Sequence, residues 1–308
     1  MKFLKKIKES RLNLILLLLY PIVTFYLLEW FTHNPWKTMK ATPQVLNIVM
    51  FELVALLLFA LFGRLHAALM TETLFFFLYG LVNYFVLNFR SVPIQPWDLF
   101  SISTAASVAD NYEYTLDKQA LLVVIGFLVL LILEFFCRYT LKKGTWKFRI
   151  PTAAVVCALL VAFGGMFHSD EIVQQKLRLY DKLFTPTTIS FKNGTALAFV
   201  MELRYISVDK PAGYNADAAR EELAAYAQPS EEPEKKPNII VIMNEAFSDP
   251  SVLGDFTTNE DYMPFVHSLL DGADNTISGH LNVSVKGGNT ANTEFEYLTG
   301  ASMAFLPY

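Results

Sequence analysis

Five long apolar runs in the first half of this 308-residue chain constrain its fold more than any other feature. Each has about 18 to 20 residues, the length that an α-helix needs to cross the roughly 30 Å hydrocarbon core of a bilayer. The runs cover residues 12–31, 45–62, 68–87, 119–136 and 150–167. The chain is 53% hydrophobic and holds 26 Phe, which is too apolar for a soluble protein of this length. We therefore predict five transmembrane helices within a membrane domain at residues 1–167.

The first run follows a basic start, and this pattern is shared by secretory signal peptides and by N-terminal membrane helices. The run has about 20 residues, long enough to span a bilayer, and no small-x-small cleavage site follows it. We expect it to stay in the protein as a membrane helix.

Charge divides the chain into two halves. Residues 1–167 carry 15 Lys/Arg against 9 Asp/Glu, a net of +6, and residues 168–308 carry 10 against 20, a net of −10, which together give the −4 of the whole chain. With a cytoplasmic N-terminus, eleven basic residues lie in inner segments and four in outer loops before residue 168. The positive-inside rule therefore predicts a multi-pass plasma-membrane protein whose residues after Phe167 are extracellular.

The extracellular half begins with a polar region at residues 168–236, in which residues 216–227 have the pattern of a surface helix. Its end is a charged linker punctuated by proline, Gln-Pro-Ser-Glu-Glu-Pro-Glu-Lys-Lys-Pro, at 228–237. We place a third region at 237–308. The two cysteines, Cys137 and Cys157, fall in predicted membrane segments, so they indicate no disulfide framework.

Two glutamates, Glu52 and Glu72, interrupt the apolar runs. An ionisable residue inside a membrane segment is a candidate functional residue because its charge is costly there. The alternative is that each lies near an interface or pairs with a polar group of a neighbouring helix. The sequence leaves the role of both open.

A short β-branched run at 238–243 predicts a buried strand, and Glu245 follows directly after its end. Open α/β sheets bind ligands at the carboxyl ends of their strands. A second predicted strand at 276–285 leads through Gly287 and Gly288 to a helix that starts near Thr290. The field at a helix N-terminus favours negative charge. Glu245 and Thr290 thus suggest half of a metal-assisted nucleophilic site.

An ordinary structural role explains the same residues equally well from spacing alone. Asn289, Thr290, Asn292 and Thr293 are all good N-cap residues, and Glu296 completes a capping-box pattern with Thr293. Glu245 reads equally as a solvated loop carboxylate. The Gly-Gly pair is not a phosphate-binding loop, and the sequence has no Ser-His-Asp arrangement and no Cys/His cluster.

The identities of the residues, in addition to their spacing, resemble those of a known family. The five apolar runs, the linker, Pro-Asn-Ile-Ile-Val-Ile-Met-Asn-Glu245-Ala-Phe-Ser and Gly-Gly-Asn-Thr290-Ala-Asn-Thr-Glu-Phe resemble the lipoteichoic acid synthase family of the sulfatase-like, alkaline phosphatase superfamily. The resemblance implies an extracellular α/β domain of which residues 237–308 are the incomplete start. It also implies Mn²⁺ (or Mg²⁺), with Thr290 as catalytic nucleophile and metal ligand and Glu245 as a second ligand.

The resemblance further implies an activity. Such enzymes are phosphoglycerol transferases that move glycerophosphate from phosphatidylglycerol to a polyglycerophosphate (lipoteichoic acid) chain or a glycolipid acceptor. We expect membrane lipids and no nucleic acid among the partners. The alternatives are a glycan-modifying phosphoglycerol transferase or a sulfatase of the same superfamily, or a non-enzymatic five-span membrane protein.

The sequence departs from the family in one respect. The family's remaining metal ligands, an Asp-His pair, lie far downstream of the nucleophile, whereas this chain has 18 residues after Thr290. We therefore expect the 308-residue chain to be an inactive fragment of an active parent.

Overall fold

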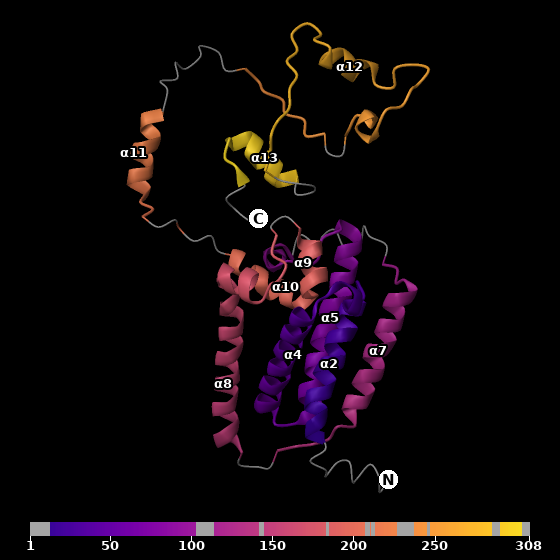
Figure 1. Ribbon diagram of the computed structural model, residues 1–308, viewed down its shortest axis with the longest axis vertical. Coiled ribbons are helices and arrows are strands. Elements are labelled where there is room, and N and C mark those ends of the chain that lie inside the picture. The colour runs from indigo at the N-terminus through magenta and orange to yellow at the C-terminus, as the bar shows by residue number, and fades with distance from the viewer. Residues whose placement is uncertain are drawn as a thin grey trace. The chain divides into compact units, whose positions relative to one another are not determined.

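The computed structural model describes residues 13–102, 114–141, 145–182, 185–206, 210, 213–226, 237–244, 247–284 and 290–303. It separates into two units, Met1–Ser207 and Val208–Tyr308. Figure 1 shows the first unit as a bundle of long helices that lie side by side. These helices are α2 (Asn13–Trp30), α4 (Ala41–Phe62), α5 (Leu65–Arg90), α7 (Lys118–Phe135) and α8 (Trp146–Gly165).

Four of the described helices are long and apolar enough to cross a membrane: α4, α5, α7, and α8 with its 3₁₀ continuation Met166–His168. The apolar part of α2, Ile15–Trp30, is shorter over the described residues. The predicted count of five spans is therefore not confirmed, while four spans are compatible with a multi-pass membrane protein. Large apolar side chains such as Phe75, Leu122 and Val161 are more than half exposed, as expected of residues that face lipid.

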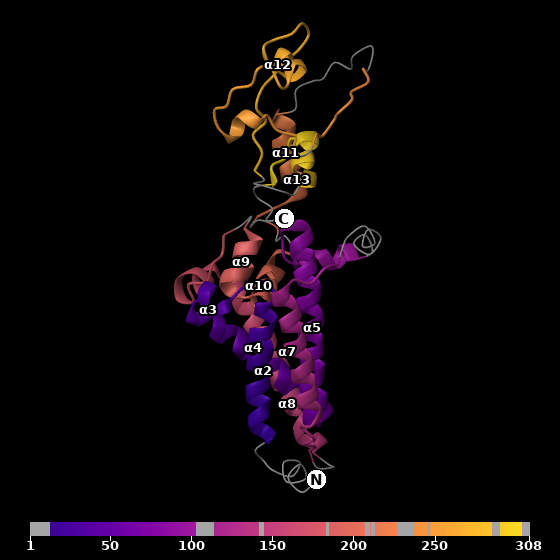
Figure 2. The ribbon, with the colours of Figure 1, turned by 90° about the vertical axis from the view of Figure 1, so that its right-hand side faces the viewer.

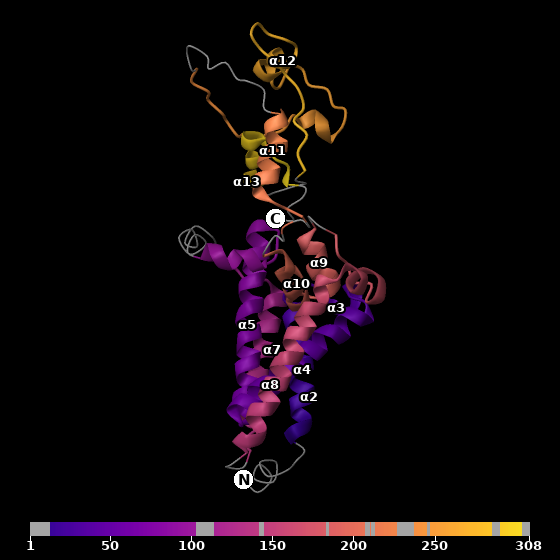
Figure 3. The same ribbon diagram turned by 90° about the vertical axis from the view of Figure 1, so that its left-hand side faces the viewer.

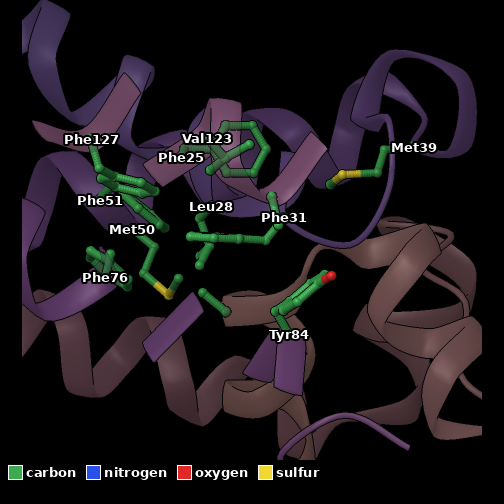
Figure 4. Packing of buried hydrophobic residues seen from close by; sticks show 12 residues of the cluster. Phe25, Leu28, Phe31, Met39, Met50, Phe51, Phe76, Tyr84, Val123 and Phe127 are labelled. Carbon is green, nitrogen blue, oxygen red and sulfur yellow. The ribbon is translucent and has the colours of Figure 1, made fainter. Parts of the chain in front are cut away.

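An aromatic layer forms the centre of the bundle (Figure 4). The rings of Phe51 in α4 and Phe76 in α5 stack with centroids 3.9 Å apart, and Phe25 of α2 meets Phe51 edge-on at 5.8 Å. Gly80 permits α5 to approach α2 closely, because a Cβ at this position would lie 2.7 Å from Cδ1 of Leu28. Tight aromatic packing thus fixes the positions of α2, α4 and α5 relative to one another.

Short helices cover one end of this bundle, as Figures 2 and 3 show from two sides. α9 and α10 meet at Gly194, and both contact α4. Residues 185–205 therefore pack against the membrane helices. The short helices of this unit are α3 (Pro35–Thr38), η1 (Pro96–Ser101), η4 (Glu171–Lys176), α9 (Pro186–Asn193), α10 (Thr195–Glu202) and η5 (Leu203–Tyr205).

Polar side chains from α2 and α4 hold the turn between α9 and α10. Glu29 accepts hydrogen bonds from the backbone N–H of Thr195, at 2.8 and 3.1 Å from its two oxygens, and from the Thr195 hydroxyl at 3.0 Å. Asn47 donates to the carbonyl of Asn193 at 2.7 Å and accepts from the N–H of Leu197 at 3.2 Å. Gly194 has φ +95° and a Cβ there would lie 2.5 Å from Nδ2 of Asn47, so the turn requires glycine.

The second unit contains α11 (Ala216–Tyr226), η6 (Pro250–Leu253), α12 (Pro264–Leu270) and α13 (Thr290–Thr299). The helices predicted near 216–227 and 290 are present. The predicted strands are not: the described residues of this unit, which include 238–243 and 276–284, contain no β-strand. A strand requires a neighbour for its backbone hydrogen bonds, and no described segment supplies one. The predicted α/β domain is therefore not confirmed.

Candidate functional site

Thr290, the predicted nucleophile, is the first residue of α13 and is half-buried. The local sequence accounts for this helix start, since Asn and Thr favour the first positions of a helix. The ten-residue length of α13 gives its N-terminus a partial positive charge. Thr290 therefore lies at the end of α13 where negative charge is favoured, and its role as a nucleophile remains a prediction.

Glu245, the predicted metal ligand, lies outside the described residues. The segment before it, residues 237–244, exposes most of its apolar side chains, with Ile239 80% and Ile242 82% exposed. The pairing of Glu245 with Thr290 thus remains a prediction.

Glu296, which the capping-box pattern paired with Thr293, makes other contacts. Its carboxylate accepts hydrogen bonds from the Ser284 N–H at 2.9 Å, from the Ser284 hydroxyl and from the Met303 N–H. The hydrogen bond from the Ser284 hydroxyl is the main cause that lowers the pKa of Glu296. Glu296 therefore ties α13 to the segment before it and to the residues after it, which fixes the helix that begins at Thr290.

The described residues alone do not form a metal site. Within the described ranges, no group of three or more His, Cys, Asp or Glu side chains is arranged to hold a metal ion. Glu245 and Thr290 would offer two oxygen ligands, which suit Mn²⁺ or Mg²⁺ chemically. Two ligands are too few for either ion, so a metal site would need further ligands beyond the described residues.

His267 of α12 lies between two aspartates. Its Nδ1 is 2.6 Å from Oδ1 of Asp261, and its Nε2 is 3.3 Å from Oδ2 of Asp249. Tyr262 donates to Asp249 at 2.6 Å, which is the main cause that lowers the pKa of that carboxyl. The hydrogen bond with Asp249 raises the pKa of His267, and the hydrogen bond with Asp261 raises it further by a smaller amount. These contacts hold α12 against the loop before it.

We predict that His267 titrates above the usual histidine pKa of about 6.5. Because the folded-state pKa is raised, the contribution of His267 to stability is fully present below the unfolded-state pKa. It is lost as pH rises through the folded-state value. NMR titration of the solubilised protein with ¹³C-labelled histidine measures this pKa. Asp249→Asn removes one carboxylate and is expected to lower it, and an unchanged titration in that variant would contradict the assigned ion pair.

Sequence reasoning singled out Glu52 and Glu72 in the membrane unit but missed three other buried glutamates. Glu72 is 1% exposed, whereas Glu52 is half-buried. Glu29 and Glu134 are both 0% exposed, and Glu202 is 3% exposed. Burial raises the pKa of Glu202 to about 8. Glu29 and Glu134 are isolated acids within or at the end of apolar runs, so the signal that marked Glu72 was also present for them.

The fold thus defines a helical protein with four candidate membrane spans and a second unit that carries Thr290 at a helix N-terminus. No protein-family model matches the chain, and no solved structure matches it. The chain is 32% identical over 278 residues to a protein of Rhizobium meliloti (strain 1021), to which the name "cyclic beta-1,2-glucan modification protein" is provisionally attached. The match covers 86% of this chain and 42% of the length of that relative. This name concerns a glucan, and it does not confirm the lipoteichoic acid assignment.

Proposed function

We propose that the protein is a membrane-anchored transferase that moves a phosphoglycerol group from phosphatidylglycerol to a hydroxyl group of a glycan outside the membrane. The observation that carries this proposal is the Thr290 hydroxyl at the first residue of α13. The motif around Glu245 and Thr290, which resembles that of phosphoglycerol transferases, supports the reaction type. The name of the relative, which refers to the modification of a cyclic glucan, supports the acceptor class.

In the proposed reaction, the oxygen of the Thr290 hydroxyl attacks the phosphorus of phosphatidylglycerol. A bond between this oxygen and phosphorus forms, and the bond from phosphorus to the diacylglycerol oxygen breaks. The hydroxyl proton leaves Thr290, and the diacylglycerol oxygen takes up a proton. In the second step a glycan hydroxyl attacks the same phosphorus and loses its proton, so that a bond between the glycan oxygen and phosphorus forms. The bond from phosphorus to the Thr290 oxygen breaks, and this oxygen takes up a proton. The N-terminus of α13 favours the negative charge that develops near Thr290 in both steps.

A threonine hydroxyl is a weak nucleophile by itself. Mn²⁺ or Mg²⁺ bound at Glu245 would lower the pKa of the hydroxyl and offset charge on the phosphoryl oxygens. We propose both this bound metal ion and a reaction that takes place on the outer side of the plasma membrane.

Transfer of label tests the proposed function directly. The protein, in the form that the cell produces, is supplied with phosphatidylglycerol labelled in its headgroup glycerol and with cyclic β-1,2-glucan. Parallel reactions contain a glycolipid acceptor or a sulfate ester in place of the glucan. We expect label on the glucan and release of diacylglycerol, both lost when EDTA removes divalent cations and restored by Mn²⁺. Label that appears only on a polyglycerophosphate glycolipid would favour a lipoteichoic acid synthase. Hydrolysis of a sulfate ester without phosphoglycerol transfer would favour a sulfatase, and no reaction with any of these substrates would contradict the enzyme assignment.

A further inference from the structure

A group of buried polar residues lies inside the helical bundle, in the unit that does not contain Thr290. Glu72 of α5 is 1% exposed, and Glu134, next to the last residue of α7, is 0% exposed. Thr73 donates its hydroxyl hydrogen to Oε1 of Glu134 at 2.6 Å. The Thr73 hydroxyl also lies 3.2 Å from that of Thr24 in α2. Three helices therefore contribute polar groups to one buried position.

Both carboxyl groups have an oxygen without a partner. Oε1 of Glu72 and Oε2 of Glu134 are buried, and neither has a hydrogen-bond partner among the residues that the structure describes. The ion pairs found in the described ranges involve neither residue. An unpaired negative charge in such an apolar interior is costly. A positive charge that the described side chains do not supply would remove this cost.

The surroundings increase the cost of a negative charge. Glu134 and Glu52 of α4 are close enough to Glu72 for their charges to interact with it. Tyr20 of α2 and Cys137, which lie near Glu134, are acidic groups that carry no positive charge. Glu134 also lies at the C-terminal end of α7, where the helix dipole is negative. Glu52 thus disfavours two ionised carboxylates, and the neighbours Tyr20 and Cys137 supply no positive charge that would offset them.

We propose that Glu72, Thr73 and Glu134 form a proton-binding site inside the membrane unit, in which at least one of the two carboxyl groups holds a proton at neutral pH. A proton fits this site better than a metal ion does. A hard cation such as Ca²⁺ takes about 6–8 oxygen ligands, whereas the site offers two oxygens without partners. No metal-binding cluster occurs in the described part of the bundle. Carboxyl groups that gain and lose protons within a membrane are the usual elements of proton relays.

Infrared spectroscopy of the solubilised, full chain tests the site without any reagent that must reach it. A protonated carboxyl group has a C=O stretching band distinct from the bands of a carboxylate. We expect this band at neutral pH, with part of it lost in Glu72→Gln or Glu134→Gln and a shift of that part in D₂O. Glutamine at position 134 keeps an oxygen that can accept from Thr73, so this variant is expected to fold. The control is Glu221→Gln, at an exposed glutamate of α11, which leaves the same part of the band in place.

Three results would overturn the proposal. The first is a carboxylic acid band that neither variant at Glu72 or Glu134 changes. The second is loss of the same part of the band in Glu221→Gln. The third is its disappearance when Na⁺ replaces choline in the buffer, which would indicate a cation site. If the glutamine variants fail to fold, Thr73→Val keeps both carboxyl groups and removes only the hydrogen bond to Glu134. It is expected to shift the band, and an unshifted band would contradict the site.

Discussion

Replacement of Thr290 by alanine, in the form of the protein that the cell produces, is expected to abolish transfer of phosphoglycerol. The expected loss in rate is about 10⁴-fold or more, since removal of a catalytic nucleophile typically costs this much. The variant lacks the oxygen to which the proposed reaction attaches the phosphoryl group. The rate is measured with headgroup-labelled phosphatidylglycerol and cyclic glucan. Mass spectrometry of the quenched protein is expected to find a phosphoglycerol adduct on Thr290 in the wild type and none in the variant.

A neighbouring threonine provides the matched control for this experiment. Thr293 lies in the first turn of the same helix and is half-buried like Thr290. Thr293→Ala also removes a side chain from the first turn of α13, but it keeps the proposed nucleophile. It is therefore expected to transfer phosphoglycerol at close to the wild-type rate. Thr290→Ser keeps a hydroxyl group and is expected to retain part of the activity. Equal losses in Thr290→Ala and Thr293→Ala would indicate that both residues serve only to start α13.

Replacement of Asn47 by leucine is expected to destabilise the membrane unit by about 2–6 kcal/mol, because it leaves two buried polar groups without a hydrogen bond and each costs about 1–3 kcal/mol. Asn47 is 0% exposed. Leucine has a similar volume, but it leaves the carbonyl of Asn193 and the N–H of Leu197 without their partner. Unfolding of the solubilised protein by urea measures the difference in the free energy of unfolding. Limited proteolysis is expected to cut first in the α9–α10 region.

The control for this variant is an asparagine on the surface of the same unit. Asn88 of α5 is exposed, so Asn88→Leu is expected to leave the free energy of unfolding nearly unchanged. If Asn47→Leu were as stable as Asn88→Leu, the turn between α9 and α10 would not depend on Asn47. The effect is specific to this residue, since Gly194 brings the backbone of the turn up to its side chain.

The local elements of this chain follow from its sequence. Runs of apolar residues predicted α4, α5, α7 and α8, because each run is long enough for a helix to cross a bilayer. The start of α12 follows from Pro264, whose fixed φ suits the first helical turn. The pattern of Asn and Thr residues near position 290 likewise predicted the start of α13. These are local properties, so no knowledge of the tertiary structure was required.

The tertiary structure determined which polar residues are buried and which distant residues they contact. Glu52 and Glu134 are both isolated acids associated with apolar runs, yet one is half-buried and the other 0% exposed. The difference depends on which side of each helix faces its neighbours, and an apolar run does not specify this. The contact of Glu29 with Thr195 joins residues 166 positions apart. Strands also depend on partners: residues 238–243 have the composition of a strand, but a strand forms only where another segment accepts its backbone hydrogen bonds.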